Sequence, residues 1–324
     1  MKLHEHQAEF DELVHSTAAY FGLQDFQVEK DYYVSLLLKT LIEKSSNIVF
    51  KGGTSLSKCY DVIKRFSEVI DLNVELEQGK TRVSDGDRRR LKNSIVETVD
   101  SLVFEILNLE AIQSRKDFNM YEVGYQKLYE NDEQMVGHII IETSVAHRVF
   151  PCEELDVSNY ITKFVESTDD PQEKKDQFFD QYEMRPFKSK VQTIDRTLID
   201  KLFAICDYYE KEKSERYSRH LYDVHKIWKS EFVNVEDLKT VLPEIIGIRQ
   251  KGRDIDTISC RPDYELRKKF EEVINTGFFK QDYRMNTSTF LFEEVGYDET
   301  IEALLEILDS GLLPEVIKEG NEST

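Results

Sequence analysis

The stretch that most constrains the fold runs from residue 50 to residue 76 and reads FKGGTSLSKCYDVIKRFSEVIDLNVEL. It begins with a short apolar run and a glycine turn, continues through a segment of helical length, and ends in strict period-two alternation. In that last segment Ile70 and Leu72 share one face, while Asp71 and Asn73 share the other. The pattern predicts a strand, a glycine turn, a helix over residues 56–64, and a strand over 69–76 that presents acids to a site.

The glycine turn is a candidate phosphate-binding element. Gly52 and Gly53 can adopt backbone conformations closed to other residues, and they allow a ligand to approach closely. A helix that begins at Ser55 or Leu56 would leave free N–H groups, which form an anion site. Many turns share such a sequence, so the turn indicates a phosphate site only in combination with the acids that follow it.

The acids that follow are typical of a metal site for nucleotidyl transfer. Mg²⁺ or Mn²⁺ held by two or three carboxylates can neutralise phosphates and activate an acceptor hydroxyl. Asp71 and, from a later β-prone run, Glu142 meet this need; the alternative for Glu142 is a surface position on an edge strand. Val69 lies on the same face as Asp71 but cannot bind metal, and Asn73 offers only a neutral oxygen.

Composition excludes several classes of protein. No apolar run approaches the length of a membrane span, and the charged N-terminus lacks the apolar core of a signal peptide. The four cysteines show no metal-ligand spacing, so we expect unpaired thiols and a cytoplasmic location. The net charge of −20 argues against binding nucleic acid over the whole surface, although a local basic patch or a basic partner protein is compatible with it.

The densest basic cluster comprises Lys80, Arg82 and residues 88–92. It has two interpretations, a solvated helix face or a contact with RNA or phosphate. The wider pattern is mixed α/β up to about residue 190 and almost wholly helical afterwards. We therefore expect an α+β (mixed α/β) chain, with an α/β domain over residues 1–190 that contains a mixed β-sheet and a mostly α-helical domain over 191–324.

Several segments resemble the AbiEii family of nucleotidyltransferase-like toxins, a branch of the polymerase-β-type nucleotidyltransferase superfamily. The resemblance spans roughly residues 27–300. The matching segments are KGGTSLSK (51–58), RFSEVIDL (65–72), EKDY (29–32), RTLIDKLFA (196–204) and SRHLYDV (218–224).

The resemblance implies a role for each matching position. The glycine turn, Gly52, Gly53, Thr54 and Ser55, would hold nucleotide phosphates; Asp71 would bind metal with help from Glu142; Lys201 would contact the triphosphate; Asp223 would be a later catalytic acid; and Arg219 and His220 would support Asp223 or the nucleotide. Without the resemblance, Lys201 would be a solvated lysine, Arg219 and Asp223 a surface ion pair, and His220 a packed side chain.

The resemblance also implies an activity and a biological setting. The activity is Mg²⁺- or Mn²⁺-dependent transfer of a nucleotide from an NTP to RNA, with tRNA ends as the narrower expectation. The site would lie in a cleft between two lobes. The setting is a toxin–antitoxin or phage-defence pair in which a cognate antitoxin protein neutralises the toxin.

The chain departs from the family pattern at Val69, where the first acid of an Asp-x-Asp pair is expected, and more mildly at Asp200, where glutamate is usual. Three explanations stay open for Val69. The chain is a weakened, NTP-binding member; it is a variant whose inactivating change allowed a toxin to be expressed; or Asp71, Asn73 and Glu142 suffice. A third class of function is a protein-interaction scaffold that keeps only the fold.

Overall fold

The computed structural model describes residues 1–67, 69–76, 80, 82–114, 116–130, 135–251 and 257–319. The chain forms two compact units. Unit 1 comprises residues 1–59, 67–145 and 153–191, and unit 2 comprises residues 60–66, 146–152 and 192–324. The expected boundary at residue 190 is near the last of these divisions, but sequence reasoning placed residues 60–66 and 146–152 in the first domain.

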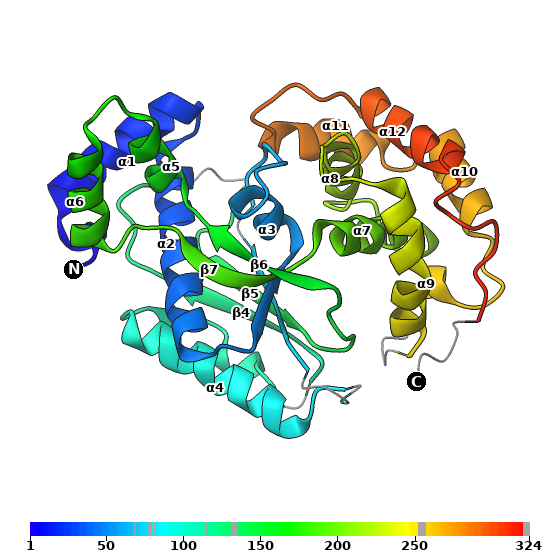
Figure 1. Cartoon of the computed structure of the whole chain (residues 1–324), viewed down its shortest axis with the longest axis horizontal. Helices are drawn as coiled ribbons and strands as arrows, with labels where there is room; N and C mark the ends of the chain where they lie inside the picture. Colours follow the sequence, from blue (N-terminus) through cyan, green and yellow to red (C-terminus); the bar gives the residue numbers. More distant parts are fainter. Residues whose placement is uncertain are drawn as a thin grey trace. The chain divides into compact units, whose positions relative to one another are not determined.

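Unit 1 is built on a seven-stranded mixed sheet with the strand order β3-β4-β5-β2-β1-β7-β6. Helices α2 and α4 lie along one side of this sheet (Figure 1). The elements are η1 (Leu3–Glu5), α1 (Gln7–Phe21), α2 (Asp25–Lys44), β1 (Ile48–Lys51), α3 (Gly52–Lys58), β2 (Val69–Val74), α4 (Asp85–Ser101), β3 (Glu105–Ile106), η2 (Leu109–Ala111), β4 (Phe118–Gly124), β5 (Ile139–Ser144), β6 (Cys152–Val157), α5 (Tyr160–Ser167), α6 (Gln172–Tyr182) and β7 (Phe187–Gln192).

The two faces of the central strands differ, as the alternation in β2 predicts. Ile70 and Leu72 are fully buried on one face, and their cross-strand neighbours Phe50 and Ile141 are fully buried with them. Asp71 lies on the other face, which is partly exposed. We call it the open face. The buried face supplies the core, so the open face is where this sheet can present functional side chains.

Helix α2 carries three buried charged residues that connect it to distant segments. Glu29 accepts hydrogen bonds from the backbone N–H groups of Leu128 and Tyr129, at 2.7 Å and 3.3 Å. Asp31 forms a buried ion pair with Lys58, at the end of α3, with Oδ1 and Nζ 2.5 Å apart. These acids lie beyond the first turn of a helix that begins at Asp25, so burial and pairing, rather than the helix dipole, account for them.

Unit 2 is helical, as expected for the C-terminal part. Its elements are α7 (Ile194–Glu210), α8 (Arg219–Trp228), α9 (Val235–Lys251), η3 (Ile258–Cys260), α10 (Leu266–Thr276), α11 (Lys280–Met285), η4 (Thr287–Phe290) and α12 (Tyr297–Asp309). Residues 60–66 belong to this unit because their backbone bonds to it: the N–H of Lys64 donates to the Tyr222 hydroxyl at 2.8 Å, and the N–H of Phe66 donates to the carbonyl of Phe290 at 3.1 Å.

The fold class is confirmed, and a few local predictions are wrong. The helix after the glycine turn begins at Gly52 and ends at Lys58, instead of covering residues 56–64. Strand β6 and helix α5 lie in a part of the chain for which the sequence pattern indicated neither element. None of the four cysteines forms a disulfide. Within the described residues, no helix is long and apolar enough to cross a bilayer.

Candidate functional site

Asp71 and Glu142 are brought together on the open face by strand register. Strands β2 and β5 are parallel and pair Asp71 with Glu142 directly. Paired residues on neighbouring strands point to the same face, and such strands lie about 4.7–4.9 Å apart. We call these two residues the acid pair. The expected adjacency of the two carboxylates is therefore observed, and both side chains are partly exposed.

The glycine turn lies against the first of these acids. Strand β1 pairs Lys51 with Asp71, so the chain enters α3 directly beside the Asp71 side chain. Gly52 has a φ of +78°, and a Cβ added to it would stand 2.0 Å from Oδ2 of Asp71. Only a residue without a side chain leaves room there for the carboxylate.

Replacing Gly52 with alanine should therefore disturb both the fold and the acid pair. The positive φ alone should cost about 1–2 kcal/mol, and Asp71 must move to admit the new methyl group. Chemical denaturation measures the stability loss. Gly86→Ala is the matched control, because the nearest neighbour of its added Cβ is 3.5 Å away and the residue lies in the first turn of α4. Equal effects of the two substitutions would contradict this account of Gly52.

The hydroxyls of the turn serve the turn itself. The Thr54 hydroxyl bonds to the Ser67 hydroxyl at 2.8 Å and also donates to the carbonyl of Val69. The Ser55 hydroxyl donates to the carbonyl of Gly52 at 2.8 Å. Both residues are fully buried. Thr54 thus holds the start of α3 onto the start of β2, and Ser55 closes the first turn of α3. This leaves the glycine backbone as the part of the turn suited to contact a phosphate.

The open face offers two carboxylate ligands for a metal ion rather than three. The described residues contain no group of three or more His, Cys, Asp or Glu side chains placed to hold a metal. The Asn73 amide is engaged with backbone: it donates to the carbonyl of Ser144 at 2.5 Å and accepts from the N–H of Val74 at 2.6 Å. Asp71 and Glu142 still fit Mg²⁺, which commonly keeps several waters and needs only one or two carboxylates.

In unit 2, Lys201 and Asp223 meet in a buried cluster with Arg65. Lys201 lies on α7 and Asp223 on α8, and Nζ of Lys201 is 2.6 Å from Oδ2 of Asp223. Arg65 donates to both carboxylate oxygens, through Nε to Oδ1 at 2.7 Å and through Nη2 to Oδ2 at 2.8 Å. We call these three residues the cation cluster. Sequence reasoning missed Arg65, although it stands at the head of the RFSEVIDL segment.

Two cations around one carboxylate determine the charge of the cluster. Burial raises the pKa of the Asp223 carboxyl, but Arg65 and Lys201 outweigh it, so this pKa lies below its ordinary value and Asp223 is ionised. Burial lowers the pKa of Lys201, partly opposed by Asp223. Because Asp223 is fully buried and bonded by both cations, it is suited to position them rather than to exchange protons. The surplus of positive charge suits an anionic ligand.

Arg219 and His220 lie one turn before Asp223 on α8. The Asp223 carboxylate pairs with Arg65 and Lys201, not with Arg219, which is exposed and makes no ion pair or hydrogen bond with any described residue. The His220 ring stacks on Tyr208, with centroids 5.6 Å apart and planes 9° apart. Burial, with the charges of Lys201 and Arg219, lowers the pKa of His220 well below its usual value, so the ring is neutral at pH 7.

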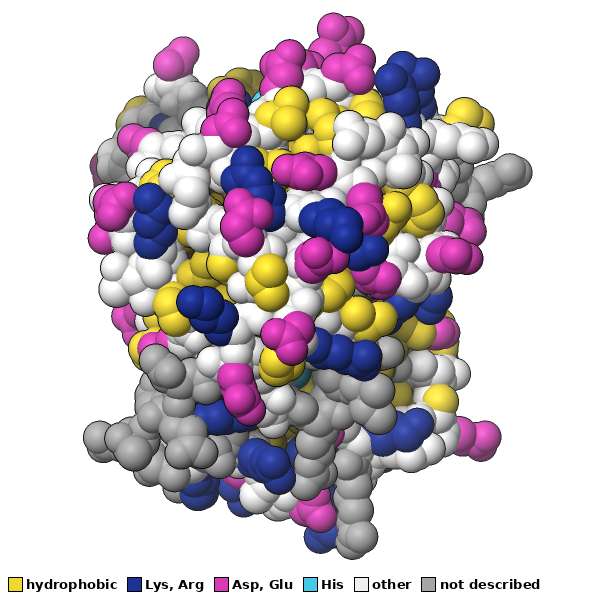
Figure 2. Space-filling view, turned by 90° about the vertical axis from the view of Figure 1, so that its right-hand side faces the viewer, with side chains coloured by type: hydrophobic (Ala, Val, Ile, Leu, Met, Phe, Trp, Pro, Cys, Tyr) yellow, Lys and Arg dark blue, Asp and Glu magenta, His cyan; other side chains and the backbone are white. Residues whose placement is uncertain are grey.

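Two arginines of the basic cluster at the start of α4 are paired with nearby acids. Arg88 pairs with Asp85 and Asp117, and Arg90 pairs with Asp87. These pairs favour the solvated-face interpretation of the cluster. On the separate face drawn in Figure 2, acidic and basic side chains are interspersed rather than gathered by sign.

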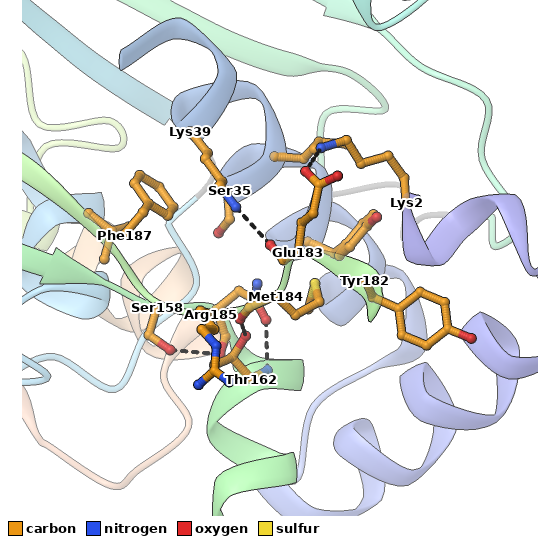
Figure 3. A pocket seen from close by; sticks show the side chains of 14 residues that line it. Lys2, Ser35, Lys39, Ser158, Thr162, Tyr182, Glu183, Met184, Arg185 and Phe187 are labelled. Carbon is orange, nitrogen blue, oxygen red and sulfur yellow. Dashed lines mark hydrogen bonds and ion pairs between the residues drawn. The ribbon is translucent and has the colours of Figure 1, made fainter. Parts of the chain in front are cut away.

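A small cavity in unit 1 is lined by none of the predicted site residues. It has a volume of about 30 Å³, enough for one or two water molecules. Figure 3 shows that its charged side chains turn toward partners: Lys2 pairs with Glu183 at 2.6 Å, and Lys39 donates to the backbone carbonyl of Glu183 at 2.8 Å. Its size and internal pairing make it a poor candidate for nucleotide binding.

Comparison with known proteins gives a family match over most of the chain. The family model described as "Nucleotidyl transferase AbiEii toxin, Type IV TA system" matches residues 36–306. Among solved structures, the chain is similar to MenT4, the nucleotidyltransferase toxin Rv2826c from Mycobacterium tuberculosis H37Rv, at 14% identity and a TM-score of 0.43, covering 91% of this chain and 98% of that one. A similarity of this size supports no statement about individual residues. No curated protein matches the chain.

Proposed function

The chain belongs to the AbiEii family of nucleotidyltransferase toxins of type IV toxin–antitoxin systems, and we propose that it transfers a nucleotide from an NTP to the end of an RNA. The narrower acceptor class is tRNA ends, and the reaction depends on Mg²⁺ or Mn²⁺. The observation that carries the proposal is the register that sets Asp71 beside Glu142, with Gly52 against the Asp71 carboxylate.

The residues of unit 1 would bind the reacting groups. Asp71 and Glu142 would hold the metal ion, which supplies charge neutralisation at the phosphates and activation of the acceptor hydroxyl. The backbone of Gly52 and Gly53 would contact phosphate oxygens, with Thr54 and Ser55 holding the turn in shape. In the transfer, the acceptor oxygen bonds to the α-phosphorus, the bond to the β-phosphate oxygen breaks, pyrophosphate leaves, and the hydroxyl proton passes to water.

The residues of unit 2 would bind the triphosphate. Lys201 would contact it, and Asp223, bonded to both Lys201 and Arg65, would hold Lys201 in place. This assigns Asp223 a positioning role instead of that of a catalytic acid. Arg219 has an exposed guanidinium for a phosphate or ribose, and the neutral His220 ring beside it can donate or accept one hydrogen bond.

Val69→Asp tests the proposal most directly. The new carboxylate would join the open face beside Asp71 and add a third metal ligand. We expect Mg²⁺-dependent transfer from a radiolabelled NTP to total RNA to rise by at least about ten-fold, and Asp71→Ala to abolish it. Each of the four NTPs is tested in turn. Val69→Ala is the matched control, and a Val69→Asp protein no more active than wild type would sink the missing-acid explanation.

A second candidate is an NTP-binding protein with weakened or lost catalysis. Val69 favours it, because it leaves Asp71 and Glu142 as a pair where the family pattern has a further acid two residues before Asp71. It predicts NTP affinity without transfer in the wild-type protein. A third possibility is a scaffold protein that retains only the fold. In that case we expect neither NTP affinity nor nucleotide transfer, and effects on growth that persist in the Asp71→Ala and Lys201→Ala variants. Calorimetric titration with each NTP and Mg²⁺, beside the transfer assay, separates the three.

The wider setting follows from the family. We propose a cytoplasmic toxin that modifies cellular RNA, that is opposed by a cognate antitoxin protein, and that takes part in phage defence. Expression of the toxin with and without its antitoxin, followed by sequencing of RNA 3′ ends, tests this. Added nucleotides that appear only without the antitoxin are the expected result, and unchanged 3′ ends in both cultures would refute it.

A further inference from the structure

The open face does not end at the acid pair. Strand β4 is antiparallel to β5 and pairs Met120 with Glu142 and Phe118 with Ser144. Met120 therefore continues the cross-sheet row that contains Lys51, Asp71 and Glu142. Leu107 lies on the same face, because a Cβ added to Gly124 would meet its side chain at 3.1 Å.

These apolar side chains are unusually exposed. Phe118, Leu107 and Met120 have 52%, 51% and 38% of their surface exposed. The opposite face of the same strand is closed, since Tyr121 and Val123 are almost completely buried. Large apolar side chains that gather on one exposed face mark a binding surface more often than an accident of sequence. Because Met120 is paired with Glu142, any ligand of these side chains must lie next to the acid pair.

Distances along the sheet set the size of the ligand. A directly opposite pair such as Met120 and Glu142 has Cβ atoms about 4.5–5.5 Å apart, and a diagonal pair such as Phe118 and Glu142 about 7–8 Å. An acceptor nucleotide whose hydroxyl reacts at the acid pair carries its base on the same sugar. That base must lie next to the acids, within reach of whatever flanks them on this face.

The chemistry on the two sides of the acid pair differs. On the β1 side stands Lys51, whose ammonium makes no ion pair with any described residue and suits a phosphate. On the β4 side stand Met120 and Phe118, which are uncharged and, being polarisable or flat, suit contact with a base. Glu122 lies on the same face two residues beyond Met120, beside Leu107 and away from Phe118, so the base would lie toward Phe118. Lys116, exposed and close to Phe118 in sequence, can meet the phosphate that precedes that base.

We propose that Phe118 and Met120 form a stacking platform for the unpaired terminal base of the RNA acceptor. This rests on the proposed function in taking RNA as the acceptor. Every turnover at the acid pair brings a nucleotide to this face, which favours a base over a protein partner as its occupant. Stacking tolerates any base, so the platform positions the RNA end without reading its sequence.

The test is a thermodynamic cycle in binding that requires no catalysis. The probes are a short unstructured RNA and the same RNA with its 3′-terminal base replaced by an abasic site, titrated with protein and Mg²⁺ without NTP and followed by fluorescence anisotropy. Wild-type protein should bind the intact RNA about ten-fold more tightly than the abasic RNA. Phe118→Ala should lose that difference, and Phe118→Trp should retain it. Phe232→Ala, which removes a phenylalanine in unit 2 with a similar exposure of 44%, is the control and should behave as wild type.

Each outcome decides one question. A Phe118→Ala protein that still discriminates the two RNAs overturns the platform, as does a wild-type protein that binds neither RNA or binds both equally. Unchanged RNA binding combined with weakened neutralisation by the antitoxin would assign the face to a protein partner and overturn it too. If binding depends on the terminal base and Phe118→Ala abolishes that dependence, the platform is supported. This holds even if no nucleotide transfer is detected, in which case the proposed catalytic activity fails while the platform stands.

Discussion

Asp223→Ala is expected to destabilise unit 2 by about 3–5 kcal/mol, because it leaves two buried cations without their shared carboxylate. The exposed fraction of Asp223 is 0%, and those of Arg65 and Lys201 are 5% and 7%, so bulk water cannot take the place of the lost carboxylate. The measurement is the shift in urea midpoint at unchanged m-value. Asp223→Asn, which keeps the shape but not the charge, should fall between alanine and wild type.

The control for this prediction is an exposed ion pair in the same unit. Glu306 pairs with Lys229 at 2.6 Å, and both side chains are nearly half exposed. Glu306→Ala should cost no more than about 1 kcal/mol. If Asp223→Ala lowered the free energy of unfolding no more than Glu306→Ala, the buried carboxylate would not be needed to hold the two cations. The stabilising role assigned to Asp223 would then be wrong.

Lys201→Met should separate stability from function in the same cluster. After this change Asp223 keeps both of its bonds to Arg65, so no buried charge loses its last partner. We expect a small effect on unfolding and a fall in transfer of roughly 10²–10³, the usual cost of losing one group that stabilises developing charge. The assay uses wild-type protein, or Val69→Asp protein if that is the active form.

Lys229→Met, at an exposed lysine of the same unit, is the matched control and should leave transfer unchanged. NTP affinity gives a second readout that does not depend on turnover, and it should weaken with Lys201→Met alone. A Lys201→Met protein that is stable and still binds NTP as wild type would remove Lys201 from the triphosphate site.

Local patterns predicted those parts of the site that are formed within one segment. The alternation of β2 placed Asp71 on the face opposite Ile70 and Leu72, and the β-prone run around residue 140 supplied the strand that carries Glu142. Helices α7 and α8 lie in the region after residue 190 that was expected to be helical. The start of α4 is likewise determined locally, because the Ser84 hydroxyl accepts a hydrogen bond from the Asp87 N–H at 3.1 Å. Each of these features is determined by residues that lie within a few positions of it in the sequence.

The parts that could not be predicted depend on distant partners. Arg65 finds its carboxylate 158 residues later in the chain, and nothing in a turn-like segment signals such a contact. The same holds for Asp31, whose partner Lys58 closes α3. The early start of α3 depends on the buried bonds of Thr54 and Ser55, which compensate for the poor helix propensity of two glycines. Glu68, in the segment that resembles the family, lies outside the described residues.

The course of the chain through the two units has a consequence for synthesis on the ribosome. Residues 60–66 emerge early, yet Arg65 belongs to a unit whose other parts are residues 146–152 and the long segment that begins at residue 192. Until Lys201 and Asp223 have been translated, the Arg65 guanidinium has no carboxylate to pair with in that cluster. The nascent chain therefore lacks the cation cluster for most of its translation. A fragment that begins at residue 192 would lack Arg65 however it was made, so the two halves cannot be exchanged or expressed as independent modules by cutting the chain once.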